Sequence, residues 1–141
     1  DFYEDLAELL AEPGIDAVVV GTPTSAHKDV IIAAARAGKH IFTEKVIAAT
    51  LEETVEIVRE VQASGVTFVV SMWRLDEAYT EAISNILKRG LLGTITQVRI
   101  RDGQPLGVPT KEHPGGLLPE RFYNVNESMG GALISYAIRS T

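Results

Sequence analysis

Cysteine is absent from this 141-residue sequence. Without thiols the chain has no disulfide bond, no thiolate nucleophile and no zinc-thiolate site. The absence is compatible with a reducing compartment, so we expect a cytoplasmic protein. Residue 1 is Asp and not Met. We therefore also expect natural sequence upstream of it, and a targeting segment there would change the expected location.

Long apolar runs and clusters of positive charge are also missing. Residues 30–35 are apolar but end at Arg36, whereas a membrane-spanning helix needs about 20 apolar residues. Nineteen acidic residues outnumber thirteen basic ones, the net charge is -6, and no basic run exceeds the pair Lys88-Arg89. We therefore expect no membrane span and no nucleic-acid-binding surface.

The chain does contain an alternation of helix and strand patterns, and its 45% hydrophobic residues suffice for the core of one domain. Apolar spacing and Gly or Pro breaks predict the helices and strands. The predicted order is helix 4–11, strand 17–20, helix 26–36, strand 40–43, helix 50–64 and strand 67–71. Nearly continuous apolar strands joined by helices are typical of an α/β fold whose parallel sheet is covered on both faces.

A different pattern follows residue 71. Asp76 is predicted to cap a helix that runs to residue 89, and Gly90 to end it. Residues 95–101 alternate apolar and polar side chains, which predicts a half-exposed antiparallel strand. Residues 102–128 form a loop-like stretch rich in Pro and Gly, and an apolar segment begins at 130–134. We place a domain boundary near residues 71–74.

The turn at residues 21–27 joins a predicted strand to the start of a helix. Free amide groups and the positive end of the helix dipole suit a phosphate or a ribose there. The alternative is purely structural, with Thr24 or Ser25 capping the helix and Pro23 fixing the turn. By itself, His27 is more typical of a surface or cap position than of a catalytic base.

Glu44-Lys45 ends the next predicted strand, a place where α/β proteins carry chemistry. Lys45 would take part in proton transfer if a crevice removed its ammonium group from water. The alternative is an exposed ion pair worth less than about 1 kcal/mol. Arg74 follows a third strand and could contact an anionic or hydroxylated ligand. The three histidines lack metal-ligand spacing, so we expect no metal site.

Several segments together resemble the glucose-fructose oxidoreductase and inositol dehydrogenase family (Gfo/Idh/MocA). They are residues 15–23 with His27, residues 37–45, residues 50–53, residues 72–79, residues 90–93 and residues 130–134. The resemblance implies that residues 1–71 are the C-terminal part of an NAD(P)-binding Rossmann domain. It also implies that residues 72–141 begin a substrate-binding α/β domain with antiparallel strands.

The resemblance further implies hydride transfer between NAD or NADP and a sugar, cyclitol or related polyol, in a protein that forms homo-oligomers. Lys45 would orient the reacting oxygen and help to move its proton, and Arg74 would stand near the domain junction. The residues implied to bind the cofactor are Thr22, Pro23, His27, Glu44 and Lys45.

Three departures from the family pattern limit this inference. The glycine-rich phosphate turn and the ribose-contacting strand are absent, so we expect roughly two β-α units of about 30 residues upstream. The family usually has Pro after the Glu-Lys pair, but here Val46 follows. A non-proline cis bond costs about 2.5 to 4 kcal/mol, which predicts a trans Lys45-Val46 peptide.

The third departure concerns the substrate side. Ser135 and Arg139 stand where the family usually has Asp and, four residues later, His. Neither can replace a general acid-base pair at neutral pH, although both stay candidate substrate-binding residues. Either the site is degenerate, or the sequence after Ile134 is not the natural continuation, which we favour as a hypothesis.

Two functions therefore stay open, with a coincidental likeness of an unrelated α/β fold as a third reading. The first is a dehydrogenase of which this chain is a fragment that is inactive alone. The second is a non-catalytic relative that binds a nucleotide or sugar as a sensor or structural subunit, which Val46, Ser135 and Arg139 would permit.

Overall fold

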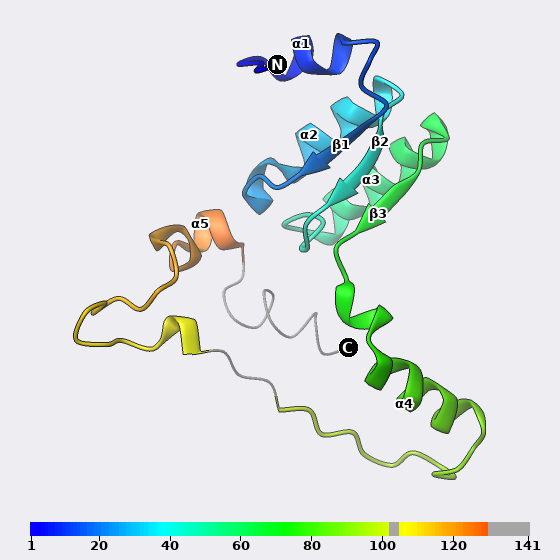
Figure 1. Cartoon of the computed structure of the whole chain (residues 1–141). Coiled ribbons are helices and arrows are strands. Elements are labelled where there is room, and N and C mark those ends of the chain that lie inside the picture. Colours follow the sequence, from blue (N-terminus) through cyan, green and yellow to red (C-terminus); the bar gives the residue numbers. More distant parts are fainter. Residues whose placement is uncertain (102–104, 130–141) are drawn as a thin grey trace.

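The computed structural model describes residues 1–101 and 105–129. Its first part alternates helices with strands that lie side by side (Figure 1). In chain order, the elements of this part are α1 (Leu6–Ala11), β1 (Ala17–Val20), α2 (Thr24–Arg36), β2 (His40–Thr43), α3 (Leu51–Ser64) and β3 (Phe68–Val70). The predicted α/β order is confirmed.

The three strands form one parallel sheet in the order β1-β2-β3. In its register, Val20 pairs with Thr43, and Thr43 pairs with Val70. A parallel neighbour has to be reached by a crossover connection, and α2 and α3 are the two crossovers. All three strands therefore end at the same edge of the sheet, which fixes where a site can form.

Local signals set the helix boundaries. Thr50 caps α3 by accepting a hydrogen bond from the backbone N–H of Glu53 at 3.2 Å. The Glu53 carboxylate returns to the chain one residue earlier than in a standard capping box, accepting from the N–H of Ala49 at 3.1 Å. Gly38 and Gly65 have φ of 73° and 68°, the left-handed conformation that ends α2 and α3 at low cost.

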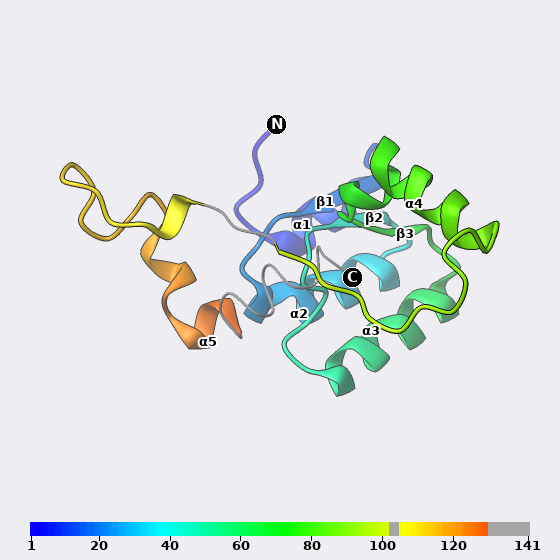
Figure 2. The same ribbon diagram turned by 90° about the horizontal axis from the view of Figure 1, so that it is seen from below.

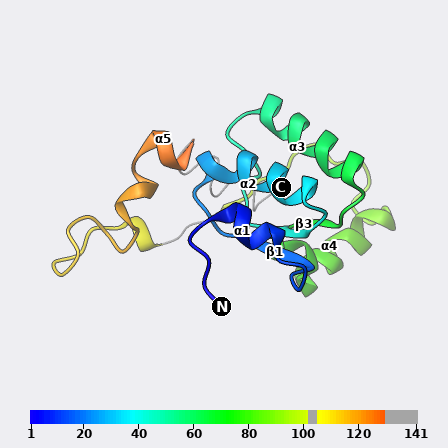
Figure 3. The ribbon, with the colours of Figure 1, turned by 90° about the horizontal axis from the view of Figure 1, so that it is seen from above.

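The core lies between the sheet and the two crossover helices. Ile31 of α2 and Ile57 of α3 are fully buried, and Val20 and Ile41 face them from the strands. Figures 2 and 3 show α2 and α3 together on one side of the strand layer. Burial of these side chains is the main source of stability in such a small layer pair, at about 1.5 to 3 kcal/mol each.

The opposite face of the sheet is exposed in the described residues. Val19, Phe42 and Val69, paired in register across the strands, keep 78%, 42% and 46% of their surface in solvent. The prediction that helices cover both faces was therefore wrong for this part of the chain. Right-handed crossovers that proceed in one direction along a sheet deliver their helices to one face, as α2 and α3 show.

Beyond β3 the chain forms a 3-10 turn, η1 (Trp73–Asp76), and then α4 (Ala78–Lys88). Asp76 does not cap the helix as predicted, because it lies inside η1 and Glu77 occupies the N-cap position without a side-chain cap. Gly90, with φ of 64°, follows the helix as predicted. Helix α4 lies across the strand layer from α2 and α3 (Figures 2 and 3).

Residues 95–101 form no strand, which corrects the predicted antiparallel strand and leaves the described residues without antiparallel pairing. A strand needs a hydrogen-bonded neighbour, and the described sheet pairs only β1, β2 and β3. Val98 and Ile100 are accordingly 71% and 57% exposed. The predicted loop holds short helical turns. They are η2 (Pro105–Gly107), η3 (Glu120–Phe122) and α5 (Val125–Ser128).

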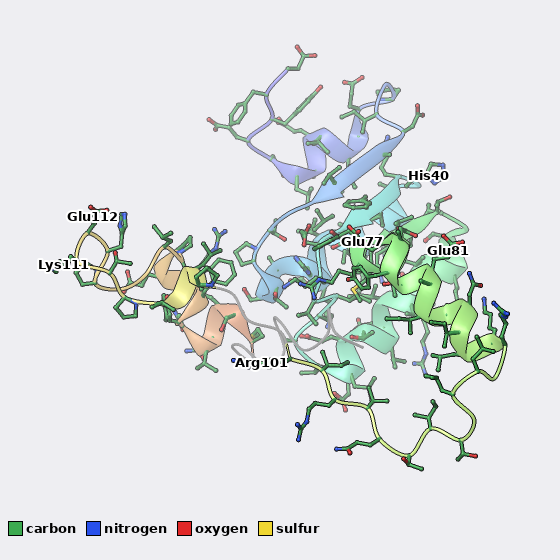
Figure 4. The ribbon with its side chains drawn as sticks, turned by 60° about the horizontal axis from the view of Figure 1, so that its bottom comes forward. His40, Glu77, Glu81, Arg101, Lys111 and Glu112 are labelled. Carbon is green, nitrogen blue, oxygen red and sulfur yellow. The ribbon has the colours of Figure 1, made fainter. Side chains whose placement is uncertain are left out.

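Lys111 and Glu112 lie at the tip of that loop, far from the sheet (Figure 4). Tyr123 closes the loop by donating a hydrogen bond from its hydroxyl to the carbonyl oxygen of Gly115 at 2.9 Å. Across the described ranges, none of the helices combines the length and the apolar character that crossing a bilayer requires. The predicted segment 130–134 lies outside the described residues.

Candidate functional site

The carboxyl ends of the three strands lie side by side. The backbone N–H of Glu44 donates to the carbonyl oxygen of Val20 at 3.0 Å, and the N–H of Ser71 donates to Thr43 at 2.8 Å. These bonds continue the parallel ladder one step past the strands. The turn after β1, the Glu44-Lys45 pair and the chain leaving β3 thus share one edge, where ligands bind in open α/β sheets.

The turn after β1 leads directly into α2. Pro23 is the N-cap of α2, with φ of -57°, and no side chain caps the helix. The structural alternative in which Thr24 or Ser25 caps the helix is therefore wrong, since both lie in its first turn. Thr22 and Pro23 are exposed. Because no side chain caps α2, the positive end of its helix dipole lies uncapped at this edge of the sheet.

His27 lies in the first turn of α2 and is 1% exposed. Its Nδ1 lies 2.7 Å from the carbonyl oxygen of Val46, and its Nε2 lies 2.9 Å from that of Thr22. The expectation from sequence that His27 sits at the surface or caps the helix was wrong. The ring is held inside the protein between the two turns, so its nitrogens face backbone and not solvent.

The Glu44-Lys45 pair occupies the middle of the edge. Glu44 is exposed and Lys45 is half-buried. The peptide bond between Lys45 and Val46 is cis, so the predicted trans bond was wrong. The prediction rested only on the intrinsic preference of a non-proline peptide bond for trans. The position of Val46 also depends on its contact with His27 of α2.

Arg74 lies in η1, on the chain that leaves β3 from the same edge. It is half-buried, and its guanidinium carbon lies 5.3 Å from the centre of the Trp73 ring, within the range of a cation–π contact. Its backbone carbonyl accepts a hydrogen bond from the Thr80 hydroxyl at 2.6 Å. Ser135 and Arg139, the other candidate substrate residues, lie outside the described residues.

Charged pairs link the two crossover helices on the outer side of the core. Lys28 of α2 pairs with Glu56 of α3 at 2.8 Å, and Arg36 pairs with Glu60 at 2.8 Å. The hydrogen bond to Glu56 raises the pKa of Lys28, and the hydrogen bond from Arg36 lowers the pKa of Glu60. Both pairs are solvent-accessible, so each contributes little to the stability of the fold.

His40 begins β2, at the end of the sheet away from the site. Its Nδ1 accepts a hydrogen bond from the backbone N–H of Thr67 at 3.0 Å, and Figure 4 shows it apart from the loop that carries Lys111. Within residues 1–101 and 105–129 no group of three His, Asp or Glu side chains is arranged to hold a metal ion.

Comparison with known proteins places this site in a family. The model of the Gfo/Idh/MocA oxidoreductase family, described as an NAD-binding Rossmann fold, matches residues 1–72, just over half of the 141 residues. The chain belongs to this family. Its match covers β1, β2, β3 and both turns of the site.

Individual relatives agree with the family match. The uncharacterised oxidoreductase YrbE of Bacillus subtilis (strain 168) is 36% identical over 115 residues, which are 80% of this chain and 34% of that protein. The scyllo-inositol 2-dehydrogenase (NAD(+)) of the same organism is 49% identical over 80 residues, covering 56% of this chain and 23% of that protein. The chain thus spans about a third of the length of the first relative and less of the second.

A solved structure supports the fold independently. The scyllo-inositol dehydrogenase from Lactobacillus casei with bound NAD(H) and scyllo-inositol has a TM-score of 0.61 and 26% sequence identity to this chain. The match covers 66% of this chain and 28% of that one. The partial Rossmann fold predicted from sequence is therefore confirmed for the Gfo/Idh/MocA chain described above.

Sequence reasoning missed two parts of the site. Thr43 ends β2 fully buried, and the role of the Val46 carbonyl as a hydrogen-bond acceptor was not considered. One signal could have revealed the burial of His27, since it stands four residues before Ile31 and residues at that spacing share a helix face.

Proposed function

We propose that this chain forms the nicotinamide-facing end of the cofactor site in an NAD(P)-dependent dehydrogenase. The protein would transfer hydride to or from a sugar, cyclitol or related hydroxyl compound. The observation that carries the proposal is the meeting of the β1 turn with Glu44-Lys45 at the carboxyl edge of the sheet. The names of the inositol dehydrogenases described above support the substrate class.

The residues at this edge fit such a cofactor. The start of α2 is free of a side-chain cap, so its first-turn N–H groups suit the hydroxyl or phosphate oxygens of a nucleotide. Thr22 and Pro23 are exposed beside it, and Glu44 offers a carboxylate to a ribose hydroxyl. His27 would contribute indirectly, because its ring contacts the backbone carbonyl oxygens of Thr22 and Val46 and does not face the cofactor.

The nicotinamide ring, when bound, would supply the hydride acceptor or donor. Lys45 is the described side chain best suited to the substrate, because it is the second residue after β2 and is half-buried at the shared edge. Its amino group would hold the reacting hydroxyl oxygen by a hydrogen bond and help to move the proton that leaves as hydride is lost. Partial burial strengthens that contact by excluding water.

The substrate would bind where two domains meet. Residues 1–71 would belong to the cofactor domain and residues 72–141 to the substrate domain, a division that the family match over residues 1–72 supports. Arg74 would stand at their junction and contact substrate hydroxyls. Ser135 and Arg139 are also proposed to face the substrate. The resemblance further supports a homo-oligomer, and the absence of cysteine is compatible with a cytoplasmic location.

The test uses the purified protein that carries this chain, incubated with NAD⁺ or NADP⁺ and with scyllo-inositol, myo-inositol or glucose. We expect one cofactor and one polyol to give reduced nicotinamide, detected by its fluorescence. Cofactor binding without turnover on any polyol would favour the sensor function, which the Val46, Ser135 and Arg139 departures permit. Absence of both binding and turnover would reject the proposal.

A further inference from the structure

The side chain of His27 contacts the turns at this edge only through their backbone, so the proposed function does not use it directly. A buried polar ring is costly unless its polar atoms find partners. Ile31, one turn further along the same face of α2, is fully buried and apolar. An apolar residue at position 27 would thus suit the core, yet a histidine stands there with a carbonyl oxygen opposite each ring nitrogen.

The two carbonyl oxygens belong to different strand ends. Thr22 follows β1 and Val46 follows β2, so a single side chain from α2 reaches both turns. The distances of 2.7 Å and 2.9 Å lie in the range of N–H···O hydrogen bonds. Carbonyl oxygens accept and do not donate. Whichever nitrogen carries the hydrogen, the ring therefore donates to one of the two turns, and with both nitrogens protonated it donates to both.

The contact with Val46 matters most because Val46 follows Lys45 directly. The last backbone bond between the two strand ends joins Glu44 to Val20, one residue before Lys45. Nδ1 of the ring lies 2.7 Å from the backbone carbonyl on the other side, one residue after Lys45. Lys45 is thus fixed between two anchors, one from the sheet and one from α2.

We infer that His27 is a positioning residue with a hydrogen on Nδ1: it donates to the Val46 carbonyl and so sets the place of Lys45, while Nε2 lies against the turn after β1. The part played by Lys45 once it is placed rests on the proposed function. The link between His27 and the backbone does not. The two can therefore be tested separately.

Three substitutions separate the contacts. His27→Phe keeps a ring but removes both donors. The amide nitrogen of Asn lies about where Nδ1 of histidine lies, and that of Gln about where Nε2 lies, so His27→Asn can still donate toward Val46 and His27→Gln toward Thr22. A matched control is Ile57→Val in the fully buried core of α3, which weakens packing without touching either turn.

The readout is the backbone amide chemical shifts of residues 44–47, recorded for the chain and each variant together with the unfolding midpoint. We expect His27→Phe and His27→Gln to shift these signals, His27→Asn to return most of the shift toward the wild-type values, and Ile57→Val to lower the midpoint while leaving them in place. Equal shifts in His27→Asn and His27→Phe, or no shift in any His27 variant, would overturn the inference.

A second arm isolates the proposed function. NAD⁺ is titrated into the protein that carries the chain, and kcat and KM for the active polyol are measured for each variant. We expect His27→Phe and His27→Gln to lower kcat at least tenfold with a smaller change in cofactor affinity, and His27→Asn to recover most of it. Amide shifts that follow the expected order without cofactor binding would reject the proposed function and leave the backbone link standing. Turnover that is equal in all three variants would overturn the positioning role.

Discussion

The backbone N–H of Glu44 donates to the carbonyl oxygen of Val20 at 3.0 Å. This bond lies just beyond the paired residues of β1 and β2, so the regular sheet ends where the candidate site begins. The side chains next to it are therefore placed by the hydrogen-bonded sheet. Rigid strands that carry residues at their ends are well suited to hold chemistry in position.

The one-sided cover of the sheet gives the first prediction. Val19 and Val20 are neighbours in β1, but Val19 is 78% exposed and Val20 is 2% exposed. We expect Val20→Thr to lower the free energy of unfolding by about 1 to 3 kcal/mol, because it buries a hydroxyl without a partner. Val19→Thr should change it by no more than about 0.5 kcal/mol.

Urea unfolding followed by circular dichroism measures both values. The two substitutions are matched in size and chemistry, and they differ in the face of the sheet that they enter. Similar losses for Val19→Thr and Val20→Thr would mean that the outer face is covered in solution.

Gly65 gives a prediction about the end of α3. Its φ of 68° is left-handed, and no atom beyond its neighbours in the chain lies within 4 Å of the place where a Cβ would stand. The cost of Gly65→Ala is therefore conformational, about 1 to 2 kcal/mol in the free energy of unfolding. Gly65→Asn should lose less, since Asn tolerates this conformation. Thermal unfolding tests the order, and an alanine variant as stable as the wild type would contradict the described turn.

The Arg36–Glu60 pair predicts a dependence on pH. The hydrogen bond from Arg36 lowers the pKa of Glu60 below its ordinary value of 4.5. The stability that this carboxylate contributes is therefore complete above pH 4.5 and is lost as the pH falls through the lower pKa of the folded state. We expect Glu60→Gln to be less stable than the wild type near neutral pH, with the difference vanishing at acid pH.

The size of that effect should be small, because both side chains are solvent-accessible and salt screens them. Unfolding measured across this pH range, at low and at high salt, gives the comparison. A difference between wild type and Glu60→Gln that stayed constant with pH would show that the pair does not persist in solution.

Much of the fold could be predicted because its signals are local. Strand 40–43 follows from its apolar pattern, and the end of the helix at residue 64 follows from the glycine after it. The predicted helix 26–36 and the observed α2 differ by two residues at the start, where Pro23 and not a hydroxyl side chain precedes the helix.

What could not be predicted depends on partners distant in sequence. Residues 95–101 alternate like a strand, yet a strand exists through its neighbour, and the described chain provides none. The burial of His27 and the cis bond after Lys45 both involve Val46, 19 residues from His27 along the chain. No local pattern records such a contact.

The most direct test of the proposed chemistry is the turnover of Lys45→Met in the protein that carries this chain. Methionine keeps most of the apolar length of the side chain and removes the amino group. We expect kcat for polyol oxidation to fall by about 10² to 10⁴, in the range of a lost proton-transfer group, with little change in the Kd of the cofactor. A variant that turned over at the wild-type rate would contradict the central role of Lys45.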